Sequence, residues 1–158
     1  MVEAGFNDAD VLFAQSMIPH HEQAIEIAEL ALDPASGASP AVRDLAGRVK
    51  SGQDPEIATL TAWLKARGKS TTMDMAGHDM STMDGMLSAA DMKALDAASG
   101  SAFDRLFYEQ MIRHHQGAVA MARIVKEDGA DPEIAALADA VIAAQSDELA
   151  EMTKAIGA

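Results

Sequence analysis

Apolar residues recur at helical spacing in four long segments of the chain. In residues 10–31 they fall three or four positions apart, as Phe13 and Met17 do, and this spacing places their side chains on one face of an α-helix. Asn7 or Asp8 is suited to cap the start of this helix, and Asp33-Pro34 ends the pattern. The pattern therefore predicts an amphipathic helix between these two signals.

Three further long helices and one short helix follow from similar signals. Ser39-Pro40 opens the second long helix, and Asp54-Pro55 is expected to break or kink it. Residues 88–91 have the pattern of a capping box and predict a short helix that ends before Gly100. The remaining long helices are expected to start at Ser101 and at Asp131-Pro132.

The chain contains an internal repeat. Residues 10–31 align without a gap on residues 104–125, and both copies hold Met-Ile-x-His-His. A weaker match follows each copy, starting at Pro40 and at Pro132. We therefore predict one domain over residues 1–158, built from two related helical hairpins. The hairpins are expected at about 7–68 and about 101–157, joined by a different connector at about 69–100.

Two amphipathic hairpins with a long connector predict an all-α protein, a four-helix bundle of the ferritin-like kind. A helix of about 25 residues is about 38 Å long at 1.5 Å per residue, a length that the connector can span. Such a crossover would bring the first and third long helices side by side. An ordinary up-down-up-down bundle is the alternative topology.

Composition narrows the classes of function. The chain has 158 residues, of which 49% are apolar and only 4% aromatic, with a formal net charge of −13. This charge argues against nucleic acid or an anionic membrane as a partner. Without cysteine, the sequence excludes disulfides, thiolate zinc sites and iron–sulfur clusters. No apolar run approaches the roughly 18 residues of a membrane span, and no export signal is evident, so we expect a cytoplasmic protein or the mature form of an exported one.

Four of the five histidines form two adjacent pairs at equivalent positions of the repeat, His20-His21 and His114-His115. On a helix each pair lies one turn from a methionine, which is Met17 in the first copy and Met111 in the second. Di-iron bundles carry Glu-x-x-His at such positions. A thioether here replaces the carboxylate, and this moves the preferred metal from iron towards copper or silver.

The sequence offers no obvious carboxylate ligand beside these histidines. Asp10 and Asp104 lie about 15 Å from them by helix rise, so capping or contact with a neighbouring helix suits both aspartates better. We find no Glu-x-x-His pair, nucleophile elbow or phosphate-binding glycine loop. We therefore predict that the protein is not an enzyme, and a redox enzyme on a ferritin-like scaffold is disfavoured.

A purely structural role is the alternative for the histidines. Buried imidazoles need hydrogen-bond partners, and aligned positions of the second and fourth long helices offer Gln53 and Gln145. A duplicated structural motif would also show the same symmetry as a duplicated site. A metal-free structural or interaction bundle therefore remains a hypothesis.

The connector is rich in methionine and poor in helical periodicity. Thioether sulfur is a soft ligand that favours Cu(I) and Ag(I). A flexible segment that interleaves such side chains with glycine and small polar residues can wrap a soft ion, or its methionines can pack over the bundle seam. The candidate ligands of this segment are Met73, Met75, His78, Met80, Met83 and Met86.

With these motifs, the chain resembles the bacterial domain-of-unknown-function 305 family, a ferritin-like helical group. The resemblance rests on DxxFxxxMIxHHxxAxxMA, matched by residues 104–122 and nearly so by residues 10–28, and on residues 95–107. Members are typically exported, and some look like copper-binding proteins that use Met and His. The resemblance implies the two Met-His-His motifs as bundle ligands and the connector methionines as further ligands. Leu60 departs from the methionine usual in the family, whereas Met152 keeps it in the fourth long helix.

We therefore predict a metal-binding protein, secreted or in the cell envelope, that sequesters copper or acts as a copper chaperone. Cu(I) is the favoured ion, and Ag(I), Cu(II) and Zn(II) are the other candidates. A protein that donates or accepts copper is the expected partner, and a homo-oligomer is one of the assemblies left open. The alternative hypothesis is a metalloprotein that holds Zn(II), Ni(II) or Cu(II) through histidine alone.

Overall fold

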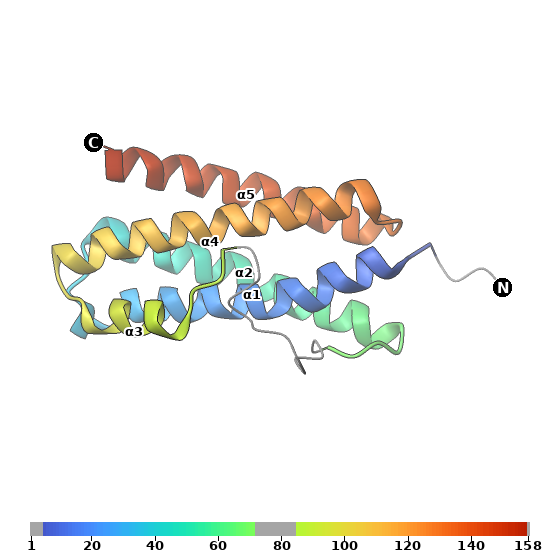
Figure 1. Cartoon of the computed structure of the whole chain (residues 1–158), viewed down its shortest axis with the longest axis horizontal. Helices are drawn as coiled ribbons and strands as arrows, with labels where there is room; N and C mark the ends of the chain where they lie inside the picture. Colours follow the sequence, from blue (N-terminus) through green and yellow to red (C-terminus); the bar gives the residue numbers. More distant parts are fainter. Residues whose placement is uncertain (1–4, 72–84, 158) are drawn as a thin grey trace.

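Two long helical hairpins pack against each other (Figure 1). In the computed structural model, which describes residues 5–71 and 85–157, the first hairpin consists of α1 (Asp8–Leu32) and α2 (Pro40–Ala66), joined by the 3-10 turn η1 (Pro34–Ser36). The second consists of α4 (Ser101–Asp128) and α5 (Pro132–Gly157), and the short helix α3 (Ala89–Ala97) precedes it. The predicted all-α fold and the short helix in the connector are confirmed.

The helix ends follow the capping signals of the sequence. Asn7 forms a capping box with Asp10, and Ser88 forms one with Asp91. The predicted break at Pro55 was wrong, because α2 continues through it from Pro40 to Ala66. Because proline has no N–H, Pro55 leaves the Ser51 carbonyl without its helical hydrogen-bond donor. Both residues are exposed, so water can donate to this carbonyl instead.

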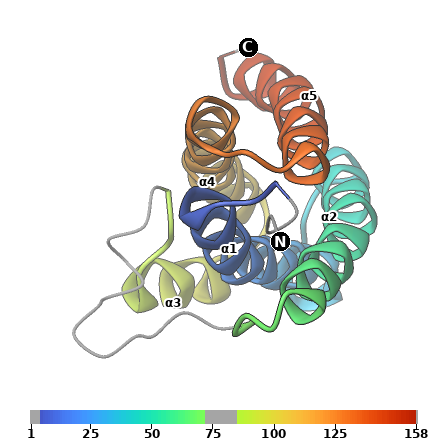
Figure 2. The same cartoon turned by 90° about the vertical axis from the view of Figure 1, so that its right-hand side faces the viewer.

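The two hairpins are linked by a crossover along the bundle. α1 and α4 lie side by side and run in opposite directions (Figures 1 and 2). α2 ends near the start of α1, whereas α4 starts at the opposite end of the bundle, where the Gly100 N–H donates to the Ser36 carbonyl at 2.8 Å. The ferritin-like connection is therefore found in place of the up-down-up-down alternative.

The apolar core consists of two clusters that lie on either side of the bundle's midpoint. The cluster near η1 is fully or almost fully buried and contains Ala24, Ile27, Ala28, Ala31, Val42, Leu45, Ala46, Val49, Leu87, Leu95, Phe103, Phe107, Met111 and Met152. The cluster near the start of α1 contains Phe13, Ala14, Met17, Ile18, Leu60, Trp63, Leu64, Ala118, Ala122, Val125, Ile134, Ala138 and Val141. Each long helix contributes to both clusters, so the residues between them define a middle layer.

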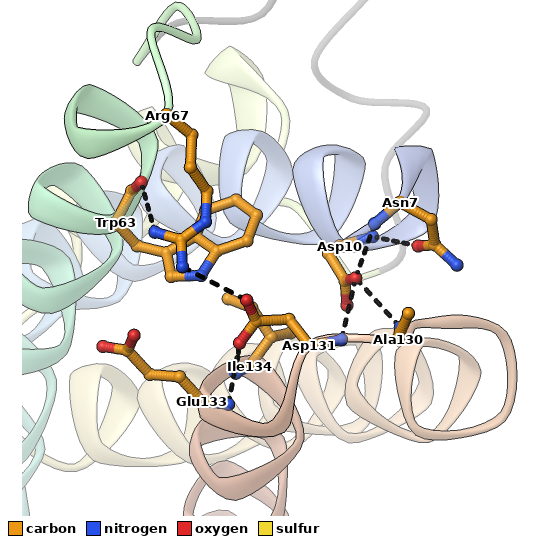
Figure 3. Close-up of polar contacts among 8 residues, drawn as sticks. All are labelled: Asn7, Asp10, Trp63, Arg67, Ala130, Asp131, Glu133 and Ile134. Atoms are coloured by element: carbon orange, nitrogen blue, oxygen red, sulfur yellow. Dashed lines mark hydrogen bonds and ion pairs between the residues drawn. The ribbon is translucent and has the colours of Figure 1, made fainter. Parts of the chain in front are cut away.

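Two buried or half-buried aspartates tie the hairpins together, and Figure 3 shows one of them. Asp10 Oδ2 accepts hydrogen bonds from the backbone N–H groups of Asn7, Ala130 and Asp131 at 2.9, 2.9 and 3.0 Å. Asp104 Oδ1 accepts one from the N–H of Ser39, the N-cap residue of α2, at 3.0 Å. The prediction that these aspartates contact neighbouring helices is confirmed.

An arginine reinforces the same end of the bundle (Figure 3). Arg67 donates to Asp131 Oδ2 at 3.2 Å and to the Trp63 carbonyl at 3.0 Å, and its guanidinium lies 4.3 Å from the Trp63 ring centroid. Charge pairing and ring stacking therefore hold the end of α2 against the start of α5. Within residues 5–71 and 85–157, no helix combines the length and apolar character of a membrane span.

Candidate metal centre

A layer of buried polar residues separates the two apolar clusters. All four long helices contribute to it, and on each helix the polar positions fall between the residues of one cluster and those of the other. The exposed fraction of every member is between 0% and 4%. The layer contains His20, His21, Gln53, His114, His115 and Gln145. Burying this many polar side chains at the centre of a bundle is costly unless they are bonded or ligated.

The first histidine of each pair faces the contact between α1 and α4. The rings of His20 and His114 lie with their centroids 3.8 Å apart and their planes inclined at 34°. Met17 and Met111 are fully buried one turn away, and each belongs to a different apolar cluster. The structure thus brings the two Met-His-His motifs, far apart in sequence, to one place at the middle of the bundle.

The second histidine of each pair faces its own hairpin partner. His21 Nε2 lies 2.7 Å from Glu56 Oε1 on α2, and His115 Nε2 lies 2.6 Å from Glu148 Oε1 on α5. The two glutamate side chains are 19% and 15% exposed, so each reaches from the layer to the surface. The absence of Glu-x-x-His in the sequence therefore did not exclude carboxylates beside the histidines, because the carboxylates come from other helices.

Several nitrogen atoms of the layer have no hydrogen-bond partner among the residues that the structure describes. They include both ring nitrogens of His114 and the Nδ1 atoms of His21 and His115. Gln53, offered by the sequence as a partner for histidine, makes no side-chain hydrogen bond within the same part of the chain. A buried imidazole nitrogen that accepts no hydrogen bond has a free lone pair, and such a lone pair is suited to bind a metal ion.

Burial sets the protonation state of His114. Desolvation lowers the pKa of its imidazole well below the usual 6.5, and the neighbouring rings of His20, His115 and His21 lower it further. The ring is consequently neutral near pH 7, which is the form that binds a metal ion.

We expect the metal-free protein to lose stability as the pH falls below about 6.5. The pKa of His114 is lower in the folded than in the unfolded chain, so over this interval the unfolded chain binds the proton. Above about pH 6.5 the residue does not change the free energy of unfolding with pH. Below about pH 6.5, each unit of falling pH lowers the free energy of unfolding by up to about 1.4 kcal/mol, until the pKa of the folded state is reached. Urea unfolding between about pH 8 and about pH 5, compared between wild type and H114L, measures the effect. Equal slopes for both proteins would contradict it.

The hard ligands of the layer do not form a preformed cluster. Across residues 5–71 and 85–157, no group of three His, Asp or Glu side chains is placed to hold a metal ion. Zn(II) in proteins usually takes four such nitrogen, oxygen or thiolate ligands, whereas a soft ion such as Cu(I) accepts thioether sulfur.

The end of the connector lies against the histidine layer. Gly85 has a φ of +77°, and a Cβ there would lie 3.0 Å from His114 Cα on α4. Gln23 on α1 exchanges two hydrogen bonds with the Leu87 backbone, at 2.8 and 3.0 Å. Met86, between these anchors, is 8% exposed. The other candidate ligands of the connector, Met73, Met75, His78, Met80 and Met83, lie outside the described residues.

The fold and the site define a class of protein, an all-helical bundle with one long crossover and a buried histidine layer. The family model described as "Domain of unknown function (DUF305)" matches residues 10–156. The chain therefore belongs to the DUF305 family, as its motifs predicted.

Solved structures of the family resemble this chain over nearly its full length. A DUF305 fragment from Deinococcus radiodurans has 30% identity and a TM-score of 0.84, covering 97% of this chain and 98% of that one. A candidate secreted protein of the family from Streptomyces coelicolor has 26% identity and a TM-score of 0.83, with 94% and 92% covered. A comparison with curated proteins gives no match.

A copper-bound protein is among the similar structures. CopM in its Cu(I)-bound form has 34% identity and a TM-score of 0.75, covering 92% of this chain and 93% of that one. CopM is also known in Cu(II)-bound and Ag-bound forms with 32–34% identity. A related protein of this fold thus binds copper and silver ions.

Proposed function

We propose that this protein binds copper, with Cu(I) as the favoured ion, and sequesters it or passes it to another protein outside the cytoplasm. The observation that carries the proposal is the convergence of both histidine pairs in one buried layer, with the His20 and His114 rings 3.8 Å apart. The copper-bound and silver-bound forms of CopM support the choice of metal. The candidate secreted relative from Streptomyces coelicolor supports the location.

The ligands that we propose come from three places in the chain. Imidazole nitrogens of the layer supply the buried donors, and Met17 and Met111 supply sulfur from either side of it. Met86 is held beside the layer by the contacts of its two neighbours, so it is the connector ligand best placed to reach it. Met73, Met75, His78, Met80 and Met83 are proposed as further ligands that first capture the ion.

Charge supports the capture of a cation. The formal net charge of −13 raises the local concentration of positive ions around the protein, and salt weakens this effect. A storage or transfer role needs no catalytic group, and we propose that the protein is not an enzyme.

A histidine-only site for Cu(II) or Zn(II) is the second candidate, and one observation favours it. Met17 and Met111 each pack within an apolar cluster, where a thioether serves as an ordinary core side chain. In that case the methionines would be structural and the imidazoles would be the only ligands.

Anaerobic competition titration separates the two candidates. We expect wild type to bind Cu(I) far more tightly than Zn(II), and replacement of Met17, Met86 and Met111 by leucine to weaken Cu(I) binding by at least about tenfold. Leucine conserves the volume of methionine, so the fold should be kept. Met92→Leu, the same change at a partly buried methionine on α3 that is not a proposed ligand, is the matched control and should leave the affinity unchanged.

Two results would contradict the proposal. Unchanged Cu(I) affinity in the triple leucine variant would favour the histidine-only site. Binding of Cu(I), Cu(II) and Zn(II) only at millimolar concentration, without selectivity, would contradict a metal-binding function altogether.

A further inference from the structure

Two glutamates each hold one histidine of the layer through the same ring atom. Glu56 Oε1 lies 2.7 Å from His21 Nε2, and Glu148 Oε1 lies 2.6 Å from His115 Nε2. Both histidines are 0% exposed, and the two pairs lie in different hairpins at positions that the sequence repeat aligns. The same contact thus occurs twice, which points to a shared role.

The contact decides which ring nitrogen carries the proton. An ionised carboxylate can only accept a hydrogen bond, so at these distances Nε2 must be the donor. The other nitrogen, Nδ1, is buried in both rings and has no hydrogen-bond partner among the described residues. A proton on Nδ1 would be a buried donor without an acceptor, so the tautomer with its lone pair on Nδ1 is favoured.

We propose that Glu56 and Glu148 are positioning residues, which fix His21 and His115 in the Nε2–H tautomer and leave Nδ1 of each ring as the atom that binds the metal. This inference rests on the proposed copper binding. Carboxylates that accept the far N–H of a ligating imidazole are common partners in metal sites, because they orient the ring and increase its basicity.

The surroundings of the pairs distinguish this role from a purely structural one. A structural histidine in a core is expected to satisfy both ring nitrogens, and here only the one facing the carboxylate is bonded within the described residues. The glutamates are partly exposed, so each keeps contact with water while it accepts from its histidine.

The first test needs no metal. Long-range nitrogen–proton NMR correlation of the metal-free protein, labelled with nitrogen-15 at histidine, reports which ring nitrogen is protonated. We expect His21 and His115 to carry the proton on Nε2 at neutral pH. A proton on Nδ1 in either ring would overturn the inference, whatever the metal affinity of the protein.

The second test adds Ag(I), a diamagnetic probe of the same soft class as Cu(I). We expect the Nδ1 resonances of His21 and His115 to shift on binding while their Nε2–H signals persist. The double variant E56Q/E148Q, whose amides no longer fix the tautomer, should bind Ag(I) about 10–100-fold more weakly. Glu22→Gln, an exposed change of the same charge on α1, is the control and should leave the affinity unchanged.

The outcomes separate this inference from the proposed function. If wild type does not bind Ag(I) or Cu(I), the proposed function fails, and the positioning role fails with it even where the tautomers are as expected. If Ag(I) binds but the Nδ1 resonances stay in place, or E56Q/E148Q binds as tightly as wild type, the function stands and the positioning role is overturned.

Discussion

Replacing His114 by leucine is expected to remove tight Cu(I) binding while leaving the metal-free protein as stable as wild type or more stable. The ring is 1% exposed, and neither of its nitrogens has a hydrogen-bond partner among the described residues, so no bond is lost with it. Leucine has a similar volume and adds apolar burial, so the free energy of unfolding should stay the same or rise by about 1–2 kcal/mol. The affinity should fall by more than about 100-fold, since even a lost outer-shell partner costs 10–100-fold.

Gln145→Leu is the matched control for this substitution. Gln145 lies in the same buried layer and is not a proposed ligand, so its replacement should keep the Cu(I) affinity. Anaerobic Cu(I) competition and urea unfolding, measured on both variants, provide the two readouts. A His114→Leu protein that loses about 2 kcal/mol or more of stability but keeps its Cu(I) affinity would show that the histidine is structural.

Replacing Asp10 by alanine is expected to cost about 3–5 kcal/mol of folding free energy. Its carboxylate is 1% exposed and accepts three backbone N–H groups, two of them from Ala130 and Asp131. Removing the carboxylate leaves these donors unsatisfied where water has little access. Urea unfolding followed by far-UV circular dichroism measures the loss.

Asp104→Ala provides the comparison within the same molecule. Asp104 occupies the position that the repeat aligns with Asp10, but it is less buried and, among the residues that the structure describes, accepts one bond, from the Ser39 N–H. Losing this bond should lower the free energy of unfolding by about 1 kcal/mol, the usual contribution of one helix-capping side chain. Equal destabilisation by the two substitutions would contradict the account of the Asp10 contacts.

Most of the fold could be predicted because its signals are local. Asn7, Ser39 and Ser88 are capping residues whose side chains bond to the following turn whatever the rest of the chain does. The break predicted at Pro55 was wrong, because the cost of a proline inside a helix depends on what its freed carbonyl meets. That carbonyl, on Ser51, belongs to an exposed residue, which only the tertiary structure shows.

The candidate site was predicted in part. The helical spacing of Met17 and His20, and its repetition at Met111 and His114, was sufficient to expect that the two motifs meet on facing helices. Glu56 and Glu148 were missed as members of the site, although the repeat aligns them, because they lie on other helices than the histidines they contact. Pairing across helices depends on helix rotation, which periodicity alone does not fix.

X-ray absorption at the copper edge of the one-to-one Cu(I) complex tests the central claim most directly. We expect a coordination shell that contains both sulfur and imidazole nitrogen, with the outer scattering of histidine rings, and we expect that scattering to weaken in His114→Leu. A shell of sulfur alone would place copper on methionines away from the layer. A shell of oxygen and nitrogen without sulfur would contradict the soft-ligand site that we propose.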